Sequence, residues 1–202
     1  MSWNKKNSDN EFQKEGSDSY ISCNPQERKI YIRGDINSHA SNYFAIGFDK
    51  MRSQKTLTVI DISSPGGNSI PGLDIYNKIR TSVCPVITMT FGTVCSAAFL
   101  IFLGGDKRII SREAMIRFHW PIGERNHEEI NLDSTETDRD YYKKLFEHYC
   151  NIIANRTGLT LRDIRKYMRY SRMFDGKQAL KMGIATAIFE DKFPNKNKKG
   201  RK

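Results

Sequence analysis

Residues 56–105 read TLTVIDISSPGGNSIPGLDIYNKIRTSVCPVITMTFGTVCSAAFLIFLGG, and this stretch decides the fold. It holds two apolar runs, and each ends at a corner marked by glycine: Ser64-Pro65-Gly66-Gly67 after the first and Gly92 to Ala98 after the second. Glycines at a strand-to-helix corner leave backbone N–H groups able to face a ligand. Ser96 would begin the next helix, where the positive end of the helix dipole favours a developing negative charge. The two corners therefore predict a functional site at one edge of a sheet.

The residues on either side of this stretch continue an alternation of strands and helices. The expected strands are 29–33, 56–62, 86–90, 107–110 and one that ends at 118–119, and the expected helices are 38–51, 73–79, 96–103, 134–157, 161–168 and 175–182. Such alternation is typical of an α/β fold, with a mostly parallel sheet and right-handed crossovers.

The length and the charge indicate one domain with polar ends. A chain of 202 residues can bury a sizeable core in a single domain. We expect a polar, mobile N-terminal arm over 1–27, one domain over 28–190 and a basic tail over 191–202. The net charge is +10, but six cations lie in the last eleven residues. A charge run at one end is usually a solvated segment, which argues against nucleic acid as a partner.

The cysteines and the apolar runs indicate a compartment and exclude a membrane span. Cys23, Cys84, Cys95 and Cys150 form no Cys-x-x-Cys pair, which favours a reducing compartment over a disulfide framework and gives no zinc spacing. The longest apolar run, 97–103, is far shorter than the roughly 18 residues that a membrane span needs. We expect a soluble protein of the cytoplasm, of an organelle stroma or matrix, or of a host cytoplasm if it is phage-encoded. No cofactor or metal is expected, and no ATP-binding loop is present.

The expected helix over 134–157 carries a broad apolar face. About 24 residues at 1.5 Å each give a length of roughly 36 Å, which is more than a small domain needs to cover its own sheet. This length suggests packing against another subunit. An ordinary core helix would show the same periodicity, and the sequence leaves both interpretations open.

Ser96, His119 and two backbone amides are the candidates for catalysis. A nucleophilic serine needs a base within hydrogen-bond reach and donors aimed at the oxyanion. His119 precedes Trp120-Pro121, so it should lie in extended backbone near a strand end. The N–H groups of Gly67 and Ala97 are the expected oxyanion donors. The alternative for Ser96 is a serine that caps its own helix.

The remaining polar candidates have structural explanations. Asp175 stands before Gly176 and a helix, so it is a helix cap first. Cys95 is expected to be a small buried residue. The remaining histidines, His39, His127 and His148, and the carboxylates Glu128 and Glu129 are assigned no role in the site.

Taken together, the two corners, the run Arg117-Phe118-His119-Trp120-Pro121 and the closing pattern from Phe174 to Ile184 resemble the proteolytic subunit of the Clp protease. The resemblance spans about 28–190 in the same order. It implies a crotonase-like spiral core with a protruding helical handle, onto which the helix starting near residue 134 maps.

The resemblance also implies a function. Ser96 would be the nucleophile and His119 the general base of a serine endopeptidase that hydrolyses peptides or unfolded proteins through an acyl-enzyme, with the amides of Gly67 and Ala97 as the oxyanion hole. Family members stack two heptameric rings around a chamber and receive unfolded chains from an ATP-driven unfoldase. The implied partners are therefore copies of this chain or paralogous subunits, an unfoldase and polypeptide substrates.

The sequence departs from the family's pattern at the acid of the catalytic triad. Where the family has aspartate before the last helix, this chain has Ser171. A serine can hydrogen-bond an imidazole but cannot supply the negative charge that stabilises imidazolium. This leaves a second function open, a weak or inactive structural ring subunit that assembles with active paralogues. A third possibility, an acyl-CoA enzyme of the crotonase type, would need a catalytic carboxylate that the sequence does not identify.

Overall fold

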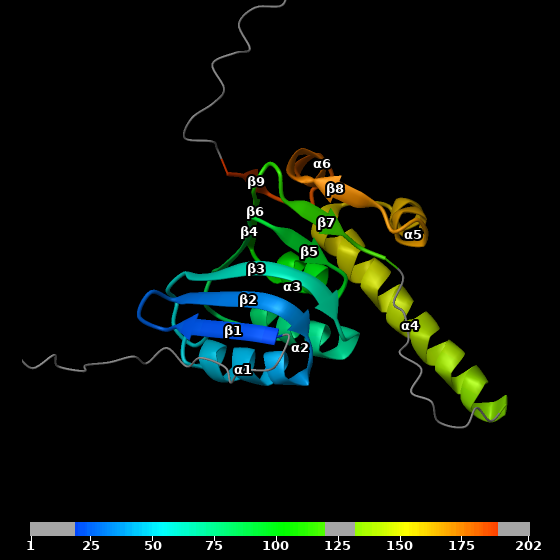
Figure 1. Cartoon of the computed structure of the whole chain (residues 1–202), viewed down its shortest axis with the longest axis horizontal. Helices are drawn as coiled ribbons and strands as arrows, with labels where there is room; N and C mark the ends of the chain where they lie inside the picture. Colours follow the sequence, from blue (N-terminus) through cyan, green and yellow to red (C-terminus); the bar gives the residue numbers. More distant parts are fainter. Residues whose placement is uncertain (1–18, 120–131, 190–202) are drawn as a thin grey trace, which may run out of the picture.

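The computed structural model describes residues 19–119 and 132–189. The strands are β1 (Ser19–Asn24), β2 (Lys29–Ile36), β3 (Thr58–Gly67), β4 (Val86–Thr90), β5 (Thr93–Cys95), β6 (Lys107–Ile110), β7 (Met115–Arg117), β8 (Met173–Asp175) and β9 (Ala187–Ile188). The helices are α1 (Ser38–Asp49), α2 (Ser69–Arg80), α3 (Ala97–Gly104), α4 (Leu132–Thr157), α5 (Leu161–Arg169) and α6 (Gly176–Lys181). Figure 1 shows α4 projecting away from the body as a long single rod.

The sheet is organised around β3, which has three neighbouring strands. Along one edge β3 pairs with β2, and along the other it pairs first with β4 and then, past Asp61, with β5. The sheet continues through β6 to β9 on one path and through β7 to β8 on the other. Only the pairs β1–β2 and β7–β8 are antiparallel. The mostly parallel α/β sheet predicted from the sequence is therefore confirmed.

The core lies between this sheet and the helices that pack on it. Isoleucines of β2 and β3 alternate toward α1 and α2, and all eight residues of α3 are buried. A helix that is apolar on every side is stable only inside the protein. Rings of Phe99, Phe118 and Phe174 stack across α3, β7 and β8, with centroid distances of 4.7 and 5.6 Å. These contacts hold the start of α3 against the end of β7.

Several boundaries differ from those that the sequence predicted. Residues 19–24, expected within a mobile arm, form β1 and pair with β2. The chain continues as a strand through Gly34, because a φ of 70° and a register shift there let β2 extend to Ile36. The Ser64 to Gly67 corner belongs to β3 itself. The short strands β5, β8 and β9 were missed, since two or three residues are too few to show a period.

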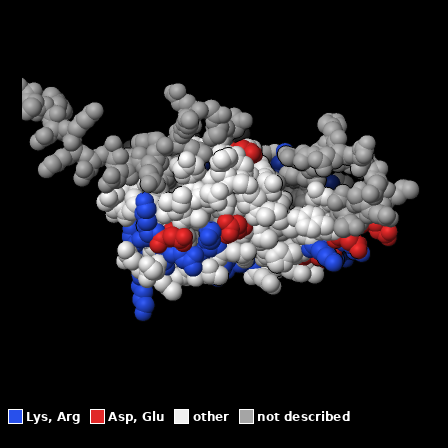
Figure 2. Space-filling view, turned by 90° about the horizontal axis from the view of Figure 1, so that it is seen from below, with Lys and Arg blue, Asp and Glu red and all other residues white. Residues whose placement is uncertain are grey.

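The charges on the surface are unevenly distributed. Figure 2, which views the molecule from below, shows Lys and Arg mixed with Asp and Glu in places and a broad uncharged area between them. α1 and α2 lie on this lower side in Figure 1, and their exposed residues include Tyr43, Ile46 and Ile70.

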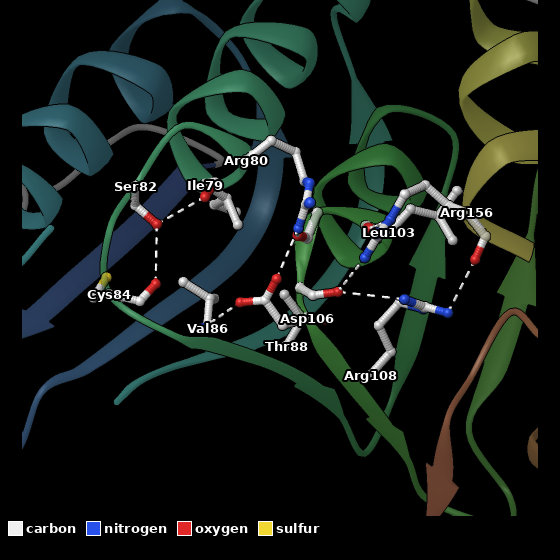
Figure 3. A network of polar contacts seen from close by, with 12 residues as sticks. Ile79, Arg80, Ser82, Cys84, Val86, Thr88, Leu103, Asp106, Arg108 and Arg156 are labelled. Atoms are coloured by element: carbon white, nitrogen blue, oxygen red, sulfur yellow. Dashed lines mark hydrogen bonds and ion pairs between the residues drawn. The ribbon is translucent and has the colours of Figure 1, made fainter. Parts of the chain in front are cut away.

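Three arginines satisfy the carbonyl groups at the C-terminal end of α3 (Figure 3). Arg156 donates to Leu103 O at 2.9 Å and to Gly105 O at 2.6 Å. Arg80 donates to Gly104 O at 3.2 Å. These carbonyls have no partner within the helix, and cations near the negative end of its dipole are stabilising.

Arg108 is the most buried member of this arginine network, with an exposed fraction of 6 %. Its guanidinium donates to four backbone carbonyls, those of Gly105, Arg156, Gly183 and Ile184. Burial, with repulsion from Arg156 and Arg80, lowers the pKa of Arg108 to about 10. The network thereby connects α3, α4 and the segment after α6.

We expect Arg108→Met to lower the free energy of unfolding by roughly 3 kcal/mol, because it leaves several buried carbonyl oxygens without donors. The free energy is to be measured by urea unfolding followed by circular dichroism. Lys55→Met, at an exposed position between α1 and β3, is the control and should change stability by less than about 0.5 kcal/mol. Equal stability of the two variants would show that the network contributes little.

Candidate active site

The ends of three adjacent parallel strands form the candidate site. β3, β5 and β7 are neighbours in the sheet and end at Gly67, Cys95 and Arg117. Because parallel strands present their carboxyl ends at the same edge, the residues that follow these strands meet there. Ser96 follows β5, and its N–H donates to Arg117 O at 2.9 Å.

A pocket at this edge contains both of the predicted side chains. It is lined by Ser69, Ser96, Phe99, Leu100, Phe118, His119, Tyr149, Ile153 and Met168. Ser96 and His119, which are 23 positions apart in the sequence, therefore share one pocket. Neither of the two is fully buried.

The backbone of Ser96 is held in an unusual conformation. Its φ is 52° and its ψ is −123°, which non-glycine residues rarely adopt and which costs roughly 1–3 kcal/mol. The Ser96 side chain makes no hydrogen bond that caps α3. The alternative of a serine that caps its own helix is therefore wrong. A strained turn that leaves the hydroxyl off the helix is the arrangement seen where a serine at a strand-to-helix turn acts as a nucleophile.

The two glycines at the end of β3 allow the corner to approach Ser96 closely. A Cβ atom on Gly66 would lie 2.6 Å from Ser96 Cβ and 3.3 Å from Ala97 N. A Cβ on Gly67 would lie 2.4 Å from Ile36 O on the neighbouring strand. Their φ values of 108° and 138° also favour glycine. The corner thus lies against the first residues of α3, next to the amide of Ala97.

The position of His119 is fixed by the aromatic residue before it. Phe118 has an exposed fraction of 2 % and packs against Phe99, Phe174 and the edge of Tyr167. Because β7 ends just before Phe118, this packing sets the point at which the chain delivers His119 to the pocket. The sequence predicted this position from the extended backbone before Pro121.

Ser171 stands two residues before β8, the strand that pairs with β7. These strands are antiparallel, with Arg117 opposite Met173. The pairing ends there, because Ser171 lies in the turn after α5, where its N–H donates to Met168 O at 3.2 Å. Ser171 has a φ of 45° and is not among the residues that line the pocket. A hydroxyl at this place carries no charge, so it would not stabilise an imidazolium as a carboxylate does.

Asp175 does not take the place of the missing acid. Its side chain accepts from Gln178 N at 2.8 Å, and the Gln178 side chain accepts from Asp175 N at 3.0 Å. This reciprocal pair is a capping box at the start of α6. The prediction of Asp175 as a helix cap is confirmed.

Cys95, directly before Ser96, is buried as predicted. Burial raises the pKa of its thiol, although the nearby Arg117 acts in the opposite direction. A neutral buried thiol is a poor nucleophile at neutral pH. Cys95 is therefore a poor candidate, and the hydroxyl of Ser96 remains the candidate nucleophile of this turn.

Sequence reasoning missed the residues that α4 and α5 contribute to the pocket. Tyr149 donates its hydroxyl to Ser69 O at 2.8 Å, and burial raises its pKa to about 12. Ile153 and Met168 complete this wall. Their helical spacing predicted a buried face but not the surface against which it packs. Tyr149 links the long helix α4 to the start of α2.

The other candidates from the sequence lie elsewhere. His39 and His148 are on α1 and α4 and do not line the pocket. His127, Glu128 and Glu129 fall outside the described residues. In the part of the chain that the structure describes, no group of three or more His, Cys, Asp or Glu side chains is arranged to hold a metal ion. No described helix is both long and apolar enough to cross a membrane.

A strained serine at the start of a buried helix, with a histidine in the same pocket, is an arrangement that serine-type hydrolases use. The profile of the Clp protease family matches residues 13–192. The chain belongs to the Clp protease family. This family consists of serine-type peptidases.

Known relatives agree with this assignment. The ATP-dependent Clp protease proteolytic subunit of Pleurastrum terricola is 31 % identical over 176 residues, covering 84 % of this chain and 87 % of the relative. Proteolytic subunit 1 of Rhodopirellula baltica is 27 % identical over 165 residues, covering 79 % and 70 % of the two chains. A mutant of ClpP1 from Listeria monocytogenes has the same fold, with a TM-score of 0.75 at 23 % identity over 83 % of this chain and 94 % of the other.

Because the side chain of Ser96 makes no hydrogen bond that caps α3, its removal should have little effect on stability. We expect Ser96→Ala to change the free energy of unfolding by less than about 0.5 kcal/mol, whereas loss of a capping serine costs about 1 kcal/mol. Ser96→Gly should be more stable than Ser96→Ala by about 1 kcal/mol, because glycine adopts the positive φ without strain. Chemical unfolding of both variants measures these differences. A loss of 1 kcal/mol or more in Ser96→Ala would contradict the geometry.

Proposed function

We propose that this chain is a serine endopeptidase subunit in which Ser96 is the nucleophile and His119 the general base. The observation that carries the proposal is the strained Ser96, whose hydroxyl does not cap α3 and which shares a pocket with His119. A purely structural serine has no reason to hold this backbone conformation. The family and the two relatives support the same chemistry.

The proposed reaction passes through an acyl-enzyme. Ser96 Oγ attacks the carbonyl carbon of the scissile peptide bond, while His119 accepts the hydroxyl proton. The N–H groups of Gly67 and Ala97 donate to the oxyanion, and the dipole of α3 adds to this stabilisation. His119 then returns the proton to the leaving amine. A water molecule, activated by His119, hydrolyses the ester and frees Ser96.

The substrates that we propose are peptides and unfolded polypeptides. The subunit would assemble with further copies or with paralogues in heptameric rings that enclose a chamber, and an ATP-driven unfoldase would deliver the substrate. The long helix α4, whose first half extends beyond the body in Figure 1, supports a role in assembly. Residues of this half, such as Glu136 and Tyr141, are exposed.

A weak or inactive ring subunit is the second candidate function, and Ser171 is the observation that favours it. Replacing the acid of a serine-protease triad with a neutral group costs on the order of 10⁴ in turnover. By contrast, an acyl-CoA enzyme of the crotonase type is not supported, because no carboxylate is found among the described residues that line the pocket.

Labelling with a fluorophosphonate probe tests the proposed nucleophile. We expect one covalent adduct per chain on Ser96, identified by peptide mass spectrometry. Ser96→Ala should abolish the adduct, and His119→Ala should slow its formation at least about 100-fold, because general-base catalysis contributes roughly 10²–10⁴.

Ser69, which also lines the pocket, provides the matched control. Ser69→Ala should label at the rate of the unmodified protein, since Ser69 contributes its backbone carbonyl to the contact with Tyr149. A folded, oligomeric protein that never acquires an adduct would exclude the peptidase proposal and leave the structural subunit.

The role of the missing acid is tested by Ser171→Asp. We expect peptidase turnover to rise at least about 100-fold, because the new carboxylate would stabilise the imidazolium of His119. Ser171→Asn is the matched control, since asparagine has the same shape without the charge. Both residues tolerate the positive φ of this position. An equal rise in both variants, or none in a folded Ser171→Asp protein, would show that charge is not what the site lacks.

A further inference from the structure

The outer side of α5 carries an unusual concentration of positive charge. Residues 161–172 contain five cations and one carboxylate, Asp163. The cations are Arg162, Arg165, Lys166, Arg169 and Arg172, and all five are exposed. We call the first four of these, which lie on the helix itself, the basic face of α5.

The helical geometry places these four residues together. At about 100° per residue, Arg162, Arg165, Lys166 and Arg169 fall within an arc of roughly 100°. Ile164 and Met168, both almost fully buried, lie on the other side of the helix. The basic face is therefore a continuous strip about two turns long rather than scattered surface charge.

Little within the described residues neutralises this strip. Arg165 pairs with Glu147 of α4, with its Nη2 2.7 Å from Oε2. Among the described residues, Arg162, Lys166, Arg169 and Arg172 have no carboxylate partner. Like charges three or four residues apart destabilise a helix by about 0.2–0.5 kcal/mol per pair. Cations suit the last turn of a helix, but Arg162 lies in the first turn, where the dipole disfavours it.

The helix that carries the basic face also contributes to the candidate active site, from its opposite side. Met168, on the same helix, lines the pocket that holds Ser96 and His119. Arg172 follows Ser171, which stands where the family has the aspartate of the triad. Figure 1 shows α5 beside the end of β7 and the upper part of α4. A chain that leaves the pocket past α5 would meet these cations.

We propose that the basic face of α5 binds acidic segments of the polypeptide substrate a few residues away from the scissile bond. The inference rests on the proposed function, because it takes the bound chain to be a substrate of the Ser96 pocket. Complementary charge near a site raises the local concentration of the oppositely charged ligand. The exposed side chains of Tyr170 and Met173 add apolar surface next to the cations.

The dimensions of the helix define where the acidic residues should lie. The basic face and the pocket are on opposite sides of α5, which is about 10 Å across. An extended chain advances about 3.3 Å per residue. The preferred acidic residues should therefore stand about three to five positions from the scissile bond, and acidic residues directly at that bond should have no advantage.

The test is an equilibrium binding assay on the full chain carrying Ser96→Ala, which does not depend on turnover. The probes are three peptides of equal length with the same uncharged fluorophore, bearing two Glu, two Gln or two Lys at matched positions. We expect the Glu peptide to bind about tenfold more tightly than the Gln peptide at 50 mM salt. The difference should shrink at 300 mM salt, because the Debye length falls below about 8 Å.

Charge variants assign the effect to the basic face. Arg169→Gln and Arg162→Gln should each weaken binding of the Glu peptide about threefold, consistent with a partly screened charge at 5–10 Å. Arg169→Lys, which keeps the charge, should leave the affinity for the Glu peptide unchanged. Lys55→Gln, which removes one exposed cation on the far side of the domain, is the matched control and should have no effect.

Three results would overturn the inference. The first is equal affinity for the Glu and Gln peptides, and the second is an equal loss in Lys55→Gln and Arg169→Gln. The third is an assignment of the basic face to another partner: tighter binding of a single-stranded oligonucleotide through the same arginines would assign it to nucleic acid. A change in oligomeric state alone would assign it to a second subunit. Hydrolysis of the Gln peptide by the unmodified protein tests the proposed function separately, and its absence would leave the binding result intact.

Discussion

The candidate site depends on β3 pairing with two different strands along the same edge. Its first half pairs with β4 and its second half with β5, so that β5 and β7 form a second short sheet at the carboxyl end of β3. All three strands are parallel, and the residues after them converge. Without this division of the edge, the glycine corner would not meet the first turn of α3, and Ser96 and His119 would not share a pocket.

The buried helix α3 connects the candidate site to the rest of the fold. Its N-terminus carries Ser96 and the amide of Ala97, and its C-terminal carbonyls are held by the arginine network in Figure 3. A helix of eight residues has little stability of its own, so its position comes from these tertiary contacts. A cost of roughly 1–3 kcal/mol for the strained Ser96 is small beside the stabilisation from burying eight apolar residues.

The sequence predicted the fold class, the main helices and the placement of Ser96 and His119 because glycine corners and apolar periods are local signals. It did not predict β5 or β8, since short strands are defined by partners far away in the chain. The pocket walls Tyr149 and Met168 were missed for the same reason. The strand β1 was missed because its sequence, SYISCN, is largely polar and too short to show a period. The family resemblance identified the departure at Ser171, which lies in the turn before β8.

The most direct test of the account is a structure of the protein after reaction with a phosphonate inhibitor. We expect the phosphorus bonded to Ser96 Oγ, its oxygen within about 3 Å of the amide nitrogens of Gly67 and Ala97, and the ring of His119 within hydrogen-bond distance of the ester oxygen. An adduct on another residue, or an adduct on Ser96 whose oxygen points away from both amides, would contradict the claim that the three strand ends build one catalytic site.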